Sequence, residues 1–148
     1  MIAHYLDPSA WVKRYFEEPG SSTIASIFAD TELVCCSSIG IVEVAATISR
    51  KGRFEHLEPD SLAGLLAQAH ADFDIFEQIV LTEEIVYSAE SLAFDLGLRA
   101  GDALHLASAI SVAHRDGIAR IIMVSADKEL LTAAGAKGLL TVNPAQLR

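Results

Sequence analysis

Ile2-Ala3-His4-Tyr5-Leu6-Asp7-Pro8-Ser9-Ala10 is the stretch of sequence that decides the fold of this chain. A short apolar run ends in a carboxylate, which is followed by proline, a small hydroxyl residue and a helical pattern. This order is typical of a buried parallel strand that leads into a helix. We therefore expect Asp7 at the carboxyl end of a strand, where open α/β sheets bind their ligands.

Short apolar runs and helical patterns alternate along the rest of the chain. Further strands are expected at residues 33–36, 75–81, 121–124 and 139–142, and helices at 9–16, after 21, 39–50, after 59, 82–95, 99–115 and 128–131. The third of these strands has polar interruptions, which favour an edge position. The alternation predicts an α/β fold, in which helices cover both faces of a mostly parallel sheet.

Length and composition predict one folded domain over residues 1–148. Hydrophobic residues make up 51% of the chain and charged residues 21%, which is typical of a globular protein. Charges interrupt every apolar run before about 18 residues, and the amino terminus lacks the basic start of a signal peptide. We therefore expect no membrane segment and a cytoplasmic location. The adjacent Cys35 and Cys36 are expected to be reduced and structural.

Asp7 and Asp127 each follow a buried apolar strand. Either could simply be the N-cap of the next helix, because aspartate often takes that position. Ser9 and Ser125 each lie two residues from one of these acids. Each serine is expected to orient a carboxylate, to hold a water or to be an ordinary turn hydroxyl.

Glu43 and Asp102 each interrupt an apolar helix. Glu43 is the only charged residue in 39–48, and Asp102 is the only acid in 100–110. A carboxylate in such a setting is costly to bury unless a cation or hydrogen bonds compensate it. The alternatives are that Glu43 shares a narrow solvent-exposed stripe with Thr47, and that Asp102 stabilises a helix dipole.

Taken together, the four acids predict a metal-dependent nuclease site. Carboxylates held close together repel each other and take up protons unless a cation is present. Mg²⁺ and Mn²⁺ prefer oxygen ligands, and they activate water and stabilise charge in phosphodiester hydrolysis. The predicted metal-binding and catalytic residues are Asp7, Glu43, Asp102 and Asp127.

Four segments in this order resemble the PIN-domain family of ribonucleases, particularly the VapC-type toxins: residues 5–10, 42–44, 101–107 and 124–127. The family implies a three-layer α/β/α sandwich, here with about five strands, and an acidic site that uses Mg²⁺ (or Mn²⁺) to cleave RNA. The four acids match the family's acidic positions, and Ser9 and Ser125 match its accompanying hydroxyls. The resemblance also implies a homodimer and a cognate antitoxin whose C-terminal segment reaches the site.

Several other side chains have two interpretations each. Lys13, Arg14 and Arg99 are the main candidates for contacts with RNA phosphates, with Arg50, Lys51 and Arg53 as further candidates, although surface charges are usually only solvated. His105 could approach the site, but a structural histidine is the commoner case. Trp11 and Tyr15 could stack on a base, receive an antitoxin helix or pack in the core or a dimer contact. For His70, Asp72 and Asp74, a solvated helix end explains the cluster better than a metal site.

Two other function classes compete with a ribonuclease. A net charge of −9 is unusual for a protein that handles RNA, which leaves open a non-catalytic module of the same fold that binds protein or RNA. A phosphoacceptor receiver domain would need a paired acid after the first strand and an aspartate at the end of the third. Here Asp7 stands alone, and the third strand ends in Val80-Leu81-Thr82.

Overall fold

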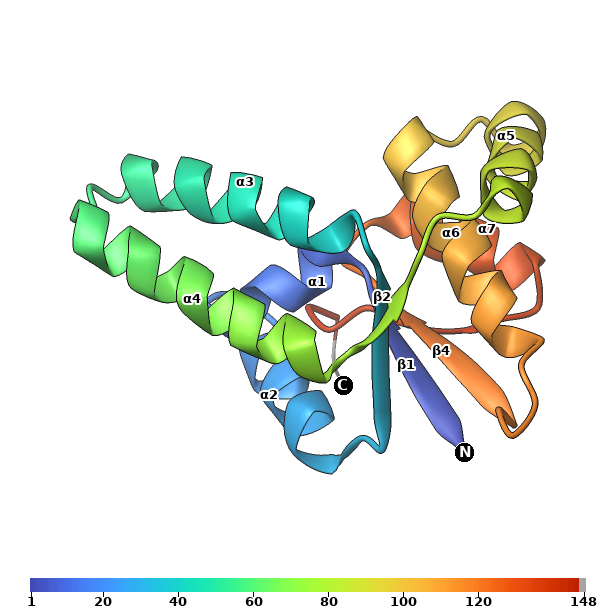
Figure 1. Ribbon diagram of the computed structural model, residues 1–148, viewed down its shortest axis with the longest axis horizontal. Helices are drawn as coiled ribbons and strands as arrows, with labels where there is room; N and C mark the ends of the chain where they lie inside the picture. Colours follow the sequence, from blue (N-terminus) through green and yellow to red (C-terminus); the bar gives the residue numbers. More distant parts are fainter. Residues whose placement is uncertain (147–148) are drawn as a thin grey trace.

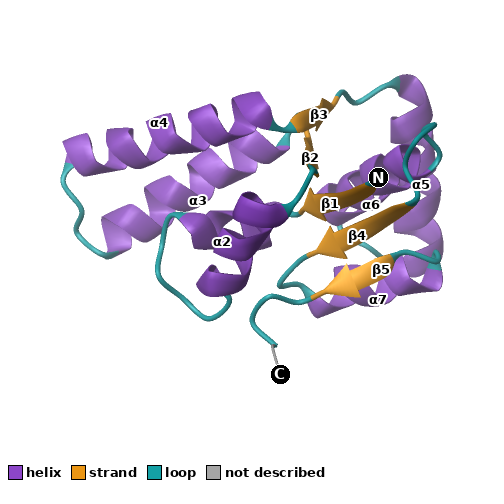
Figure 2. Cartoon of the chain, turned by 90° about the horizontal axis from the view of Figure 1, so that it is seen from below, coloured by secondary structure: helices purple, strands orange, loops and turns teal. Residues whose placement is uncertain are grey.

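The five strands in the described part of the chain run parallel, in the spatial order β3-β2-β1-β4-β5 (Figure 2). The computed structural model describes residues 1–146. β1 is central, and its Tyr5 pairs with Cys35 on one side and Met123 on the other. The strands are β1 (Ile2–Leu6), β2 (Leu33–Ser37), β3 (Glu77–Ile79), β4 (Arg120–Val124) and β5 (Leu140–Val142). The predicted parallel sheet of about five strands is confirmed, with the polar third strand at an edge.

Helices cover both faces of the sheet. The helical segments are α1 (Pro8–Trp11), the 3-10 turn η1 (Val12–Arg14), α2 (Ser21–Asp30), α3 (Gly40–Phe54), α4 (Pro59–Ile75), α5 (Glu83–Leu96), α6 (Ala100–Ala113) and α7 (Lys128–Ala136). Successive side chains of a strand point to opposite faces. Tyr5 therefore meets α6 on one face, while His4 lines a hollow with residues of α2 on the other. The predicted α/β/α sandwich is confirmed.

α3 and α4 lie side by side and project away from the sheet as an arm (Figure 1). α3 continues to Phe54, beyond the predicted end at residue 50, and it passes through Gly52 without a break. A Cβ at Gly52 would collide with the side chain of Leu62 on α4, so the glycine allows the two helices to approach closely. Packing between helices thus outweighs the low helix propensity of glycine at this position.

Several other predicted boundaries were displaced. The predicted strand at 75–81 is only Glu77–Ile79, because α4 extends to Ile75, and α7 runs to Ala136 rather than 131. α2 begins directly after Gly20, which is its N-cap and has a φ of +99°. Among residues 1–146, no helix is both long and apolar enough to cross a bilayer.

Aromatic residues of the arm and the first helical turn form part of the core. Trp11 is fully buried, and its ring lies 5.5 Å from that of Phe73 and 4.9 Å from that of Phe76. Its Nε1 donates a hydrogen bond to the Tyr15 hydroxyl at 2.7 Å. Of the alternatives for Trp11 and Tyr15, core packing is the observed one.

Asp72 joins this core and is not solvated. Its carboxylate accepts hydrogen bonds from Arg14 Nε at 2.8 Å and from the Tyr15 hydroxyl at 2.7 Å. The interpretation of residues 70–74 as a solvated helix end therefore holds for the exposed His70 and Asp74 and was wrong for Asp72. Sequence reasoning missed this because the partners of Asp72 lie 57 and 58 positions earlier in the chain.

Candidate active site

Asp7 is held by two serine hydroxyls at the carboxyl end of β1. Its Oδ2 accepts hydrogen bonds from Ser9 Oγ at 2.5 Å and from Ser125 Oγ at 2.9 Å. Asp7 stands at the N-cap position of α1 but makes no side-chain cap hydrogen bond. Burial raises the pKa of Asp7, while nearby His105 and the two hydroxyls act in the opposite direction by favouring the ionised form.

The two serines are themselves fixed by the backbone that follows β4. Ser9 Oγ accepts a hydrogen bond from the Ala126 N–H at 3.1 Å, and Ser125 Oγ accepts one from the Asp127 N–H at 3.0 Å. Each hydroxyl accepts from the backbone and donates to Asp7, so its hydrogen has a defined direction. Both serines therefore orient the Asp7 carboxylate, and they connect it to the turn that carries Asp127.

A buried histidine connects Glu43 to the sheet. The Ser37 N–H donates to the Tyr5 hydroxyl at 2.9 Å, and this hydroxyl lies 2.7 Å from His105 Nδ1. Burial raises the pKa of Tyr5 well above its usual value, so the phenol keeps its hydrogen and donates it to Nδ1. The histidine proton is then on Nε2, which donates to Glu43 Oε1 at 2.6 Å.

Glu43 reaches the first turn of α6, which is the turn that carries Asp102. A Cβ placed on Gly101 would lie 3.9 Å from Glu43 Oε2, so this second oxygen faces the helix start that carries Asp102. Partial burial, together with the negative charges of Asp127 and Asp7, raises the pKa of Asp102 to about 6. The negative charge of Glu43 acts on Asp7, whose pKa it helps to raise. The charges of all four predicted acids therefore act within one region at the carboxyl ends of the strands.

Asp127 is the N-cap of α7, as one of the two interpretations of its position predicts. Its Oδ1 accepts hydrogen bonds from the Glu129 N–H at 2.9 Å and the Leu130 N–H at 3.2 Å. Its negative charge nevertheless acts on Asp102. Capping and membership of the acidic cluster therefore coexist in this residue.

The chemistry of these side chains fits a divalent cation, although they do not form a closed metal site. Within residues 1–146, no group of three or more His, Cys, Asp or Glu side chains is arranged to hold a metal ion. The donors are hard carboxylate oxygens, and the raised pKa values of Asp7 and Asp102 show that added negative charge is unfavourable here. Burial is the main cause of both raised pKa values and neighbouring negative charge adds to it, and a bound divalent cation would offset both effects.

The predicted RNA-binding cations occupy different environments. Lys13 is buried and paired with Glu18 at 3.0 Å, whereas Arg14 is paired with Asp72 and lies 4.0 Å above the Phe28 ring. Arg99 is exposed before α6, and its charge acts on Asp102 by favouring the ionised carboxylate. The structure thus brings Arg99 close to the acids, whereas Lys13 and Arg14 form ion pairs within the fold.

Tyr5 is the member of the site that sequence reasoning missed. Nothing in the local sequence distinguishes it from a core tyrosine, because its partner His105 is 100 positions away. His105 did carry a signal, since it lies one helical turn after Asp102 on an apolar helix. It is a fully buried structural histidine that also bonds to a predicted catalytic acid.

Comparison with known proteins gives consistent results. The family model for the PIN domain matches residues 4–135. Ribonuclease VapC45 and Ribonuclease VapC49, from two strains of Mycobacterium tuberculosis, are each 33% identical to this chain over 147 residues. Each alignment covers 97% of this chain and 96% of the relative.

The fold is also similar to solved structures. A toxin-antitoxin complex from Klebsiella pneumoniae contains a chain that superposes with a TM-score of 0.68 at 16% identity, covering 97% of this chain and 99% of that one. At this identity the similarity concerns the fold alone. The family-model match and the two relatives aligned over nearly their full length show the family. This chain belongs to the PIN-domain family.

Proposed function

We propose that this protein is a divalent-metal-dependent endoribonuclease of the VapC type, and the toxin of a toxin–antitoxin pair. The observation that carries the proposal is the electrostatic convergence of Asp7, Glu43, Asp102 and Asp127 at one end of a PIN-domain sheet. Full-length similarity to two proteins named as VapC ribonucleases supports RNA as the substrate. Such a substrate is consistent with the cytoplasmic location expected from the sequence.

The four carboxylates are the residues that would hold Mg²⁺ (or Mn²⁺). When bound, the metal supplies activation of water and neutralises charge on the phosphate. Ser9 and Ser125 hold the Asp7 carboxylate in one orientation and favour its ionised form. His105 fixes one oxygen of Glu43, and its hydrogen bond to Tyr5 prevents the ring from turning. Exposed Arg99 binds a substrate phosphate beside Asp102.

Two protein partners follow from the family assignment. The first is a cognate antitoxin that blocks the enzyme, and the Klebsiella pneumoniae chain of similar fold, which belongs to a toxin-antitoxin complex, supports such a partner. The second is another copy of this chain, which completes a homodimer.

A non-catalytic binding module is the second candidate. The observations that favour it are the net charge of −9 and, in the described part of the chain, the lack of a closed group of metal ligands. This candidate predicts that the purified protein binds neither Mg²⁺ nor Mn²⁺. Calorimetric titration with each metal therefore separates the two candidates.

The decisive experiment is cleavage of a mixed RNA pool by the purified protein. We expect cleavage with Mg²⁺ or Mn²⁺, none with EDTA, and none by the folded variants Asp7→Asn and Asp102→Asn. Asp95→Asn, which changes an exposed acid on α5, is the matched control and should cleave like wild type. Equal cleavage by wild type and Asp7→Asn would identify a contaminating nuclease and would count against the proposal.

A further inference from the structure

We propose that one face of α3 binds single-stranded RNA and guides it from the tip of the arm to the carboxylates. We call this face the α3 stripe, and it consists of Glu43, Thr47, Arg50 and Phe54. The inference rests on the proposed ribonuclease function and adds to it a substrate-binding surface. Its members include none of Lys13, Arg14 and Arg99, the main cations selected from the sequence.

The spacing of the stripe places its members in one row. Residues at i, i+4, i+7 and i+11 lie on the same side of a helix with 3.6 residues per turn. With a rise of 1.5 Å per residue, Glu43 and Phe54 are separated by about 16 Å along the helix axis. Because α3 points outward from the sheet (Figure 1), the stripe leads from the candidate site to the end of the arm.

The arginines of α3 are exposed and directed back toward the site. Arg50 Nη2 donates to Thr47 Oγ1 at 3.3 Å, and Arg53 Nε donates to Ser49 Oγ at 3.0 Å. Within residues 1–146, neither arginine has a carboxylate within ion-pair distance, although the chain carries 20 acidic residues. An unpaired guanidinium on so acidic a protein is well suited to a phosphate.

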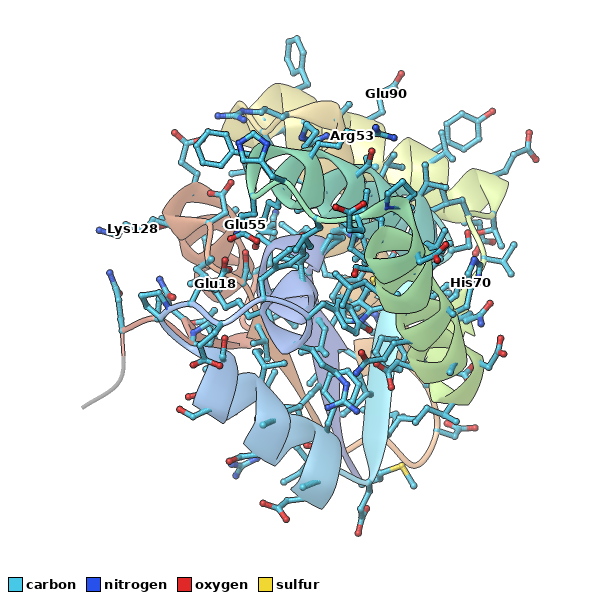
Figure 3. The ribbon with its side chains drawn as sticks, turned by 90° about the vertical axis from the view of Figure 1, so that its left-hand side faces the viewer. Glu18, Arg53, Glu55, His70, Glu90 and Lys128 are labelled. Carbon is cyan, nitrogen blue, oxygen red and sulfur yellow. The ribbon has the colours of Figure 1, made fainter. Side chains whose placement is uncertain are left out.

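Lys51, the neighbouring cation, has a structural role instead. It forms an ion pair with Glu18, and its ammonium lies 5.4 Å from the centre of the Phe16 ring. Figure 3 views the arm from its tip and labels Arg53 and Glu55 there, with Glu18 lower down. Among the cations of α3, Arg50 and Arg53 are therefore the ones available to a ligand.

Phe54 ends the stripe with an exposed aromatic ring. Its side chain is 86% exposed, and it lines a shallow hollow of about 320 Å³ with Arg50, Lys51 and Glu55. An aromatic ring beside guanidinium groups is the combination that single-strand binding proteins use, because every base offers a face for stacking. Glu55 is the one anion in this hollow, and it would favour the face of a base over a second phosphate.

RNA is favoured over a protein partner by the charge and direction of the stripe. A strand whose scissile phosphate reaches Glu43 must continue along some surface, and α3 offers a cation and then a ring in line with that point. A protein contact would explain the exposed ring but not the row that leads to the acids. A protein contact at Phe54 is nevertheless one of the outcomes that the experiment distinguishes.

The test compares Arg50→Gln and Phe54→Ala with two matched controls. Arg120→Gln removes an exposed arginine at the start of β4, and Phe94→Ala removes a ring on α5 that is 89% exposed. We expect each stripe variant to raise KM for RNA cleavage about tenfold while kcat changes less than about twofold. Arg50→Gln should also lower the salt dependence of binding, with the log–log slope smaller by about 0.7.

A direct optical reporter makes the stripe testable even without cleavage. Trp11 is the only tryptophan and is fully buried, so Phe54→Trp adds an exposed reporter whose fluorescence a stacked base should quench. Phe94→Trp is its control, titrated with the same mixed-sequence single-stranded RNA in Mg²⁺. Quenching confined to Phe54→Trp supports the stripe, and equal quenching, or none in either variant, overturns it.

The remaining outcomes separate this inference from the proposed function. If wild type cleaves RNA and the stripe variants match their controls, the stripe is wrong and the nuclease assignment stands. If wild type fails to cleave, the proposed function fails. The fluorescence titration still shows whether RNA binds the α3 stripe. If Phe54→Ala leaves KM unchanged but converts a dimer to a monomer in sedimentation, the ring is a contact between copies and the inference is overturned.

Discussion

Asp102 carries electrostatic strain in the metal-free protein. Its pKa is raised from 3.8 to about 6, so the folded state disfavours the ionised form. The resulting penalty is absent below about pH 3.8 and complete above about pH 6, which means that this group lowers stability as pH rises through that window. A shift of about two units corresponds to about 3 kcal/mol, and partial exposure reduces the expected effect to about 1 kcal/mol.

We therefore predict that Asp102→Asn stabilises the metal-free protein while it abolishes cleavage. In EDTA at about pH 7.5, the free energy of unfolding in urea should rise by about 1 kcal/mol relative to wild type. The difference should shrink toward zero near about pH 4. Asp95→Asn should show no such gain, and a destabilised Asp102→Asn under the same conditions would contradict the electrostatic interpretation.

Tyr5 is the residue through which the sheet positions His105. We predict that Tyr5→Phe lowers the free energy of unfolding by about 2 kcal/mol, because the Ser37 N–H and His105 Nδ1 lose their buried partner. Tyr87→Phe on α5, where the ring is exposed, should be neutral. Nitrogen NMR of the imidazole should report the Nε2–H tautomer of His105 in wild type, and finding the Nδ1–H tautomer would refute the assigned network.

At the scale of elements, α7 allows the two roles of Asp127 to be separated. Asp127→Ala should cost about 1 kcal/mol through loss of the N-cap and should also abolish cleavage. Asp127→Asn retains an oxygen that accepts from the Glu129 and Leu130 N–H groups, so it should keep nearly full stability and still lose cleavage.

Thr82 supplies the matched control, because its side chain caps α5 away from the acids by accepting from the Ile85 N–H. Thr82→Ala should lose comparable stability while cleavage is unchanged. Thermal unfolding and the RNA cleavage assay measure the two effects in parallel. Full activity in Asp127→Asn would mean that Asp127 is only a cap.

The elements also show where sequence patterns are reliable. β1 and β4 were predicted to within one residue, because each is a short apolar run whose end is marked by an acidic turn. The ends of α3 and α4 were not, because their extra turns depend on contact with each other. Glycine usually favours a helix end, yet Gly52 lies inside α3, where Leu62 packs against it.

At the scale of the whole molecule, a divalent metal held by the four acids would make the free energy of unfolding depend on metal concentration. We predict that Mg²⁺ raises the free energy of unfolding by about 2.7 kcal/mol at a free concentration of about 100 times its Kd. EDTA should reverse the gain, and NaCl of matched ionic strength should not reproduce it. Calorimetric unfolding measures this, and an identical gain in Asp7→Asn would place the metal elsewhere on the protein.

The sequence by itself determined the fold class and selected the four acids as candidates for the site. Period-two and period-3.6 patterns are local, and a carboxylate in an apolar helix or at a strand end is visible without knowing its neighbours. The tertiary structure alone decided which atoms meet. Ser125 reaches Asp7 across 118 positions, and Tyr5 reaches His105 across 100. It also paired Lys13 and Arg14 with acids inside the fold and left Arg50 free on the arm, because ion pairing depends on distance in space, which no local pattern encodes.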